Sequence, residues 1–349
     1  MRLNILGKDI FILLITIFCL PACAYRGVVD TPRTLKIGLV APFEGLHRPL
    51  GYEALFGVKL ALQERNLAQG SHGYRVELVA LNDFDDPVEA EIQAKALIAD
   101  PDVLGVVGHL SSATTLAAVP IYQEAELAVS IPWSVAPDWD MGRGGVVSVA
   151  ADSAETSARL ETVGREMGLN NITELADTNL GSIAGNSQAF SLATDGVTAG
   201  GIMLSLRQAD LSLPVLGQVD VGSPQTVQVA QAAANGLIFV SPGPDPRQVA
   251  EAASFVEAYQ ALAGFPPGPR AVLAYDATQI LLDGIEQSLR INDNHSPTRT
   301  EVSAVIAKVQ RQGLSGDIVF DGQGRRVNAP IWIYRIVDGV YPGVLLSPQ

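Results

Sequence analysis

The chain has 349 residues, of which 48% are hydrophobic and 17% charged, and these values favour two folded domains of ordinary size over a disordered chain. The formal net charge is -14 and no cluster of Lys and Arg interrupts it, which argues against nucleic acid as a partner. The only cysteines, Cys19 and Cys23, lie near the N-terminus, and the four histidines show no metal-ligand spacing. We therefore expect no disulfide framework, metal or other cofactor.

The first 22 residues have the composition of a secretory signal peptide. Basic residues precede an apolar run over 11–20, which is too short to span a bilayer comfortably. The following LPAC at 20–23 resembles a bacterial lipobox, although Pro21 is uncommon there; a plain signal peptide with an incidental cysteine is the alternative. We predict a signal peptide over 1–22, lipidation of Cys23, a tether over 23–33 and an extracytoplasmic protein anchored to the bacterial cell membrane.

Short apolar runs alternate with amphipathic segments through the first half of the chain. Asp85, Asp86 and Pro87 form an acidic cap and a first-turn proline, which predicts the start of a helix. Such alternation is typical of a parallel, doubly wound α/β sheet with right-handed crossovers. The predicted strands are 35–40, 75–81, 103–108 and 128–132, and the predicted helices are 52–66, the segment opened by Pro87, and 111–126.

The second half is less regular. A helix over 300–312 has apolar residues at helical spacing and is expected to end at Gly313. Residues 331–337 and 340–345 predict a hairpin across Asp338 and Gly339. The other predicted strands are 172–175, 189–194, 214–219, 237–240 and 318–320, and the other predicted helices are 157–167, 197–211, 246–263 and 271–289.

Five motifs resemble the type I periplasmic binding protein family, and within it the leucine/isoleucine/valine-binding group. The similarity spans about residues 35–345 and is poor between 150 and 195. The motifs are KIGLVAP at 36–42, LNDFDDP at 81–87, GHLSSATT at 108–115, AYDA at 274–277 and GLSGDIVFD at 313–321.

The resemblance implies two Rossmann-like lobes with parallel sheets, joined by three crossovers, with the ligand in the cleft. Mapped onto this chain, lobe one covers 34–150 plus 243–323, and lobe two covers 151–242 plus 324–349. The main part of lobe two then has only 92 residues. Because a βαβ unit takes about 30 residues or more, we expect a shortened second lobe that lacks one unit. In the family, the missing stretch carries an aromatic residue that covers the ligand.

By the same resemblance, the chain is a substrate-binding protein that delivers an amino acid, by default of the branched-chain type, to an ABC transporter permease. The segment from Ser111 to Thr114 follows a predicted strand and opens a helix, where hydroxyls, N–H groups and the helix dipole favour a carboxylate. Ser112 matches the family's carboxylate-binding serine. Simple N-capping is the alternative reading.

Further candidates come from three other segments. Trp133 and Ser134 follow the fourth strand, before an apolar Val135 where the family usually has a hydroxyl; Leu50 replaces a frequent aromatic. Asp220 lies one residue from the family's ammonium-binding acidic position, and a solvated loop aspartate is the alternative. Tyr275 is a further candidate, for which packing near the hinge is the alternative. The predicted ligand-binding residues are Ser111, Ser112, Ala113, Thr114, Trp133, Ser134, Asp220 and Tyr275.

Two other classes of protein compete with this interpretation. His109 and Ser111 share a loop, which suggests a base and a nucleophile, but the chain has no G-x-S-x-G, Walker A or G-x-G-x-x-G motif. We therefore do not expect an enzyme. The other alternative is a ligand sensor or accessory protein of the same fold, for which a shortened second lobe would be suitable.

Overall fold

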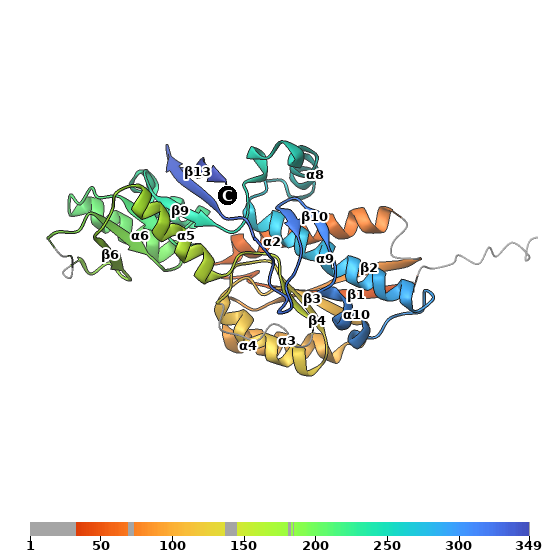
Figure 1. Cartoon of the computed structure of the whole chain (residues 1–349). Coiled ribbons are helices and arrows are strands. Elements are labelled where there is room, and N and C mark those ends of the chain that lie inside the picture. Colours follow the sequence, from red (N-terminus) through yellow and green to blue (C-terminus); the bar gives the residue numbers. More distant parts are fainter. Residues whose placement is uncertain (1–32, 69–72, 137–144, 181–182, 184, 349) are drawn as a thin grey trace, which may run out of the picture. The chain divides into compact units, whose positions relative to one another are not determined.

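The computed structural model describes residues 33–68, 73–136, 145–180, 183 and 185–348, and it contains two α/β sheets with their covering helices (Figure 1). The predicted signal peptide, Cys23 and all but the last residue of the tether lie outside the described residues. Within those residues, no helix has the length and apolar character needed to cross a membrane.

The first sheet has five strands in the order β2-β1-β3-β4-β5, and the pairs β1–β3, β3–β4 and β4–β5 are parallel. Apolar side chains on α3 and α4 pack on one face of this sheet, and those on α2, α9 and α10 pack on the other. The strands are β1 (Arg33–Ala41), β2 (Tyr74–Asn82), β3 (Val103–Val107), β4 (Ala128–Ile131) and β5 (Val146–Ser148), and the helices are α2 (Arg48–Leu67), α3 (Pro87–Ala99), α4 (Ser112–Glu124), α9 (Pro269–Ile291) and α10 (Arg299–Ile306).

Short polar side chains set the starts of these helices. The Asp86 carboxylate accepts the backbone N–H groups of Val88 and Glu89 at 2.8 and 3.1 Å, so Asp86 is the N-cap of α3 as predicted. Ser111 is the N-cap of α4. These caps fix where the helices begin at the strand ends, which is the edge where ligands bind in open α/β sheets.

The second sheet has six strands in the order β13-β12-β9-β8-β7-β6. Strands β6 to β9 are parallel, and β12 and β13 are antiparallel additions beside β9. Helix α5 packs on one face over β8 and β9, and α6 and α7 lie with the other apolar cluster. The strands are β6 (Ile172–Leu175), β7 (Ala189–Leu192), β8 (Val215–Gly217), β9 (Ile238–Ser241), β12 (Trp332–Val337) and β13 (Val340–Pro348), and the helices are α5 (Ser153–Glu166), α6 (Gly196–Gln208) and α7 (Pro224–Ala230).

The connection between β6 and β7 accounts for the short second lobe. Its described residues, 176–180, 183 and 185–188, contain no α-helix, and β6 pairs with β7 at the edge of the sheet. A complete doubly wound unit would place helices on the faces of these strands. The prediction was the loss of a whole βαβ unit, whereas the structure keeps both strands and lacks an α-helix in the described residues between them.

The chain changes sheets between β5 and α5, returns after β9, and enters the second sheet again before β12. This agrees with the crossovers that the resemblance implied. On the return, two 3-10 turns, η3 (Pro246–Gln248) and η4 (Ala250–Ala252), lead into helix α8 (Ala253–Ala263).

Two predicted helices are wrong in their extent. The segment 246–263 is not one helix, because Val249 has an extended backbone conformation between η3 and η4. The predicted helix 300–312 ends at Ile306, and β10 (Arg311–Gly313) pairs with β11 (Gly316–Ile318) in an antiparallel hairpin. Gly313 is therefore no helix-ending glycine; a Cβ there would lie 2.7 Å from the Asp276 carboxylate. Strand β5 and helix α7 were not predicted.

Candidate functional site

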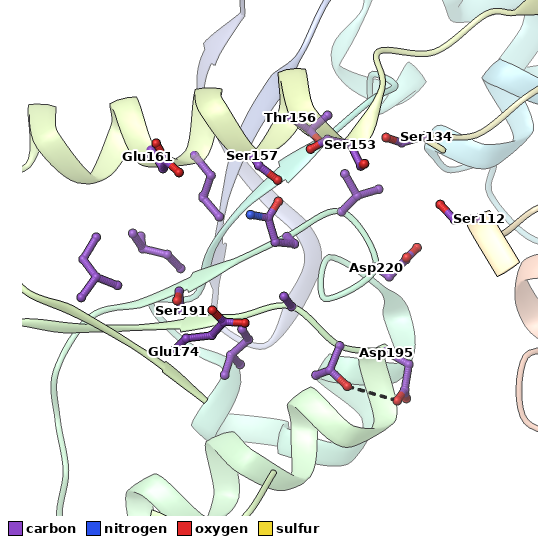
Figure 2. A pocket seen from close by; sticks show the side chains of 18 residues that line it. Ser112, Ser134, Ser153, Thr156, Ser157, Glu161, Glu174, Ser191, Asp195 and Asp220 are labelled. Atoms are coloured by element: carbon purple, nitrogen blue, oxygen red, sulfur yellow. Dashed lines mark hydrogen bonds between the residues drawn. The ribbon is translucent and has the colours of Figure 1, made fainter. Parts of the chain in front are cut away.

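A cavity of about 760 Å³ lies at the carboxyl ends of β7 and β8 (Figure 2). Its lining combines lobe-two residues from α5, β6, β7 and β8 with Ser112 and Ser134 of the first lobe. This position is the one that open parallel sheets use for ligands. The cavity is the main candidate site among the described residues, and a smaller cavity of about 90 Å³ lies beside it, sharing Asp195 and Asp220.

The four predicted contacts at the start of α4 divide into different roles. The Ser112 side chain lines the large cavity, and Ser111 lines the small one. The Ser111 hydroxyl also accepts the Thr114 N–H at 3.4 Å, so the capping role and a ligand role coexist there. Ala113 and Thr114 line neither cavity; the buried Thr114 hydroxyl donates to the Ser111 carbonyl at 3.2 Å.

Ser134 contributes an unused polar group to the large cavity. The residue is 7% exposed, and its hydroxyl has no hydrogen-bond partner among the described residues. A buried hydroxyl without a partner costs free energy unless a ligand or water satisfies it. Val135, the next residue, is fully buried in the core of the first lobe, so the hydroxyl at this loop comes from Ser134 alone.

Trp133, Asp220 and Arg270 form one cluster. The Trp133 indole N–H donates to the Asp220 carboxylate at 3.1 Å, and the Arg270 guanidinium donates to the same oxygen at 3.2 Å. The guanidinium also stacks on the Trp133 ring, 3.7 Å from its centroid. Because Arg270 compensates its charge, Asp220 is not the free carboxylate that the sequence suggested for an ammonium group. Trp133 is buried and acts on the site through Asp220.

Arg270 was not among the predicted site residues, because nothing in its local sequence distinguishes it. It lies in the first turn of α9, and its side chain is 3% exposed. The buried Glu53 carboxylate accepts the backbone N–H groups of Arg270 and Ala271 at 2.9 and 3.2 Å and so caps this helix. Burial raises the pKa of Glu53, although the nearby Arg270 opposes the shift.

Asp195 has the corresponding role in the second lobe. Its carboxylate accepts the N–H groups of Val197 and Thr198 at 2.8 and 3.1 Å, which makes it the N-cap of α6. Burial acts to raise the pKa of Asp195, but the hydrogen bonds from Thr198 and Val197 outweigh it and lower the pKa. Asp195 therefore stays ionised at the junction of the two cavities.

The structure places Tyr275 away from both cavities, which corrects its inclusion among the ligand contacts. Its hydroxyl donates to the Glu64 carboxylate at 2.5 Å, and its ring packs edge-on against Phe255 at 5.2 Å. Asp276, the next residue, accepts the N–H groups of Leu314 and Ser315 and has a structural role.

His109 is likewise a structural residue. Its Nδ1 lies 2.8 Å from the Asp83 carboxylate and its Nε2 lies 3.3 Å from the Tyr122 hydroxyl, and the His109 and Asp83 side chains are fully buried. Both ring nitrogens therefore have partners, and neither bonds to Ser111. His109 is therefore not placed to act as a base for the Ser111 hydroxyl.

Two α/β lobes, each built on parallel strands, place serine hydroxyls and carboxylates around one cavity, and this arrangement defines a solute-binding class of protein. The periplasmic binding protein family model matches residues 34–176 and 173–340, and the chain belongs to this family. The resemblance stated from the motifs is thus confirmed.

The chain is similar to the leucine-, isoleucine-, valine-, threonine- and alanine-binding protein of Pseudomonas aeruginosa, with 24% identity over 86% of this chain and 90% of the relative. Among solved structures it is similar to the branched-chain amino acid transporter substrate-binding protein LivJ of Streptococcus pneumoniae in complex with isoleucine, with a TM-score of 0.80, 20% identity, and coverage of 91% of this chain and 99% of that one.

A second similar structure is an ABC transporter solute-binding protein of R. palustris in complex with benzoate. Its TM-score is 0.76 at 18% identity, and the match covers 90% of this chain and 96% of that one. The ligands named in these two complexes, isoleucine and benzoate, both carry a carboxylate.

Proposed function

We propose that this protein is the extracytoplasmic substrate-binding component of an ABC transporter and that it binds an amino acid through the large cavity. The named relatives, one binding leucine, isoleucine, valine, threonine and alanine and one in complex with isoleucine, support an amino acid as the ligand. An ABC transporter permease is then the protein partner.

The observation that carries the proposal is the pair of serine hydroxyls, Ser112 and Ser134, that open on one cavity with Asp220. The Ser112 hydroxyl at the N-terminus of α4 and the Ser134 hydroxyl in the loop after β4 suit the carboxylate of an amino acid, and a carboxylate acceptor suits its ammonium. Because Arg270 already forms an ion pair with Asp220, the ligand ammonium would bind the remaining acceptor positions of the Asp220 carboxylate or the carboxylate of Asp195.

The localisation rests on residues outside the described ranges. We infer that residues 1–22 are removed on export and that Cys23 is acylated, which would hold the protein on the membrane beside the permease. Mass spectrometry of the mature N-terminus tests this directly: a diacylated or triacylated Cys23 supports the anchor, and an unmodified N-terminus contradicts it.

A ligand sensor or accessory protein of the same fold is the second candidate. The lack of an α-helix in the described residues between β6 and β7 favours it, because the lobe that would close on a transported ligand is shortened. Reconstituted transport with the permease separates the two: ligand-dependent ATP hydrolysis supports the transport role.

The first test is calorimetric titration of the purified protein with the amino acids named for the relatives, followed by the variant Ser112→Ala. Losing the hydrogen bond from the Ser112 hydroxyl to the ligand carboxylate is expected to weaken binding by about 1.5–3 kcal/mol. Ser254→Ala, on the exposed face of α8, is the matched control and should leave affinity unchanged. Wild-type affinity in Ser112→Ala would overturn the proposed carboxylate site.

A further inference from the structure

The large cavity is longer than an amino acid of the branched-chain type requires. It extends along α5 from Ser153 to Glu161, which at the helical rise is about 12 Å. Its volume of about 760 Å³ lies in the range of sites for drug-sized ligands rather than for single small residues. Part of the cavity therefore lies beyond the serine hydroxyls of the mouth.

This distal part lies on the sheet face where α5 packs mainly over β8 and β9, whereas α6 packs with β6 and β7 on the opposite face. On the face of the sheet that α5 covers, Leu160 and Val163 pack with Leu216 of β8 and Ile238 of β9. The neighbouring positions of the same face are polar: Glu174 of β6 pairs in register with Ser191 of β7, which pairs in register with Leu216. We call the region formed by Glu161, Ile172, Glu174 and Ser191 the acidic floor (Figure 2).

The charges of the cavity are unbalanced at this floor. Four carboxylates line the cavity and none of the lining residues is Lys, Arg or His. Asp220 is compensated by Arg270, and Asp195 by the N-terminus of α6. The side-chain carboxylates of Glu161 and Glu174 have no ion pair or hydrogen bond with another described residue, so their negative charge is the part that a ligand would neutralise.

A second observation in the same cavity points to a ligand. The buried Ser134 hydroxyl has no partner among the described residues, and Figure 2 shows it directed toward the side on which Ser153 and Thr156 lie. Ser112 and Ser134 thus hold donors at one end of the cavity, and Glu161 and Glu174 hold acceptors at the other. A ligand that satisfies both ends has a carboxylate at one end and a cation at the other.

We infer that the acidic floor binds the cationic side-chain group of an amino acid, so that the preferred ligands are basic amino acids such as arginine or lysine. This inference rests on the proposed amino-acid binding and specifies its substrate class. The α-carboxylate lies at Ser112 and Ser134, and the guanidinium or ammonium lies between Glu161 and Glu174. A charge-assisted hydrogen bond to a carboxylate is stronger than one between neutral groups, which gives the floor its selectivity.

The test compares L-arginine, L-citrulline and L-leucine by calorimetric titration of the full protein. Citrulline keeps the length of arginine but has no side-chain charge, so we expect it to bind about tenfold more weakly than arginine or worse. Glu161→Gln and Glu174→Gln should each bring arginine toward the affinity of citrulline. Glu166→Gln removes the same charge from α5 outside the cavity and should leave the arginine affinity unchanged.

The outcomes separate this inference from the proposed function. Binding of leucine that is lost in Ser112→Ala, with no preference for arginine over citrulline, would overturn the acidic floor and leave the amino-acid site standing. Equal arginine affinity in Glu174→Gln and Glu166→Gln would also overturn it. Binding of none of the three amino acids would overturn both. Thermal unfolding of each variant without ligand verifies that these exposed positions leave the fold intact.

Discussion

The two lobes cap a helix with the same kind of carboxylate in different surroundings. In each lobe a carboxylate accepts two backbone N–H groups at the start of a helix: Glu53 at α9 in lobe one and Asp195 at α6 in lobe two. Glu53 is buried, and its pKa is raised; Asp195 is only partly buried, and its pKa is lowered. The N–H hydrogen bonds lower the pKa of both carboxyl groups, and the extent of burial decides whether the net shift is upward or downward.

The two sheets also differ in how far their carboxylates are buried. In lobe one, apolar helices pack on both faces, and its buried carboxylates Asp83 and Asp276 have partners on several sides. In lobe two, α5 packs mainly over β8 and β9, and Glu174 of β6 is exposed. Polar groups in lobe one therefore stabilise the fold, whereas those on the acidic floor of lobe two remain available to a ligand.

The largest expected effect tests this contrast by removing a carboxylate from each lobe. Asp276→Ala leaves the N–H groups of Leu314 and Ser315 and the Ser315 hydroxyl without their acceptor, and we expect it to lower the free energy of unfolding by about 3 kcal/mol or more. Glu174→Ala should change it by about 0.5 kcal/mol or less. Urea unfolding measures both, and equal losses would break the contrast.

A smaller effect should appear in the pH dependence of stability. The pKa of Glu53 is raised in the folded protein, so its contribution to stability declines as the pH rises from its ordinary value of 4.5 through the folded value. The pKa of Asp195 is lowered, so its contribution is present above its ordinary value of 3.8 and is lost as the pH falls through the folded value.

The variants Glu53→Gln and Asp195→Asn measure these slopes. Relative to the wild type, Glu53→Gln should gain stability as the pH rises, and Asp195→Asn should gain it as the pH falls. Urea unfolding between about pH 3 and pH 7 gives both curves, with Glu257→Gln on the exposed face of α8 as the control. Slopes of the same sign for the two variants would contradict the roles assigned to burial.

The smallest expected effect concerns the contact between the lobes. Trp133→Phe removes the indole N–H to Asp220 but keeps an aromatic ring against Arg270, so we expect a loss of about 1 kcal/mol in the free energy of unfolding. In a background of Asp220→Asn the cost of the same change should fall, because the acceptor is altered. An unchanged cost would show that Trp133 acts by packing alone.

Much of the fold could be predicted from local patterns. The first four strands of the first sheet, the cap at Asp86 and the hairpin across Asp338 and Gly339 follow from apolar periodicity and turn chemistry, which depend on neighbours in the chain. Strand β5 was missed because three residues carry no period, and the helix over 300–312 was extended too far because the pairing of β10 with β11 overrides helical spacing.

The candidate site was likewise predictable only in part from the sequence. Residue types and position along the chain were enough to place Ser112, Ser134 and Asp220 at strand ends, because a parallel sheet brings those ends to one edge. Only the tertiary structure decided that Arg270, 50 residues from Asp220, compensates its charge, that Tyr275 faces Glu64, and that Glu174 is uncovered. Those outcomes depend on which helices cover which strands, and packing between distant segments leaves no local pattern in the sequence.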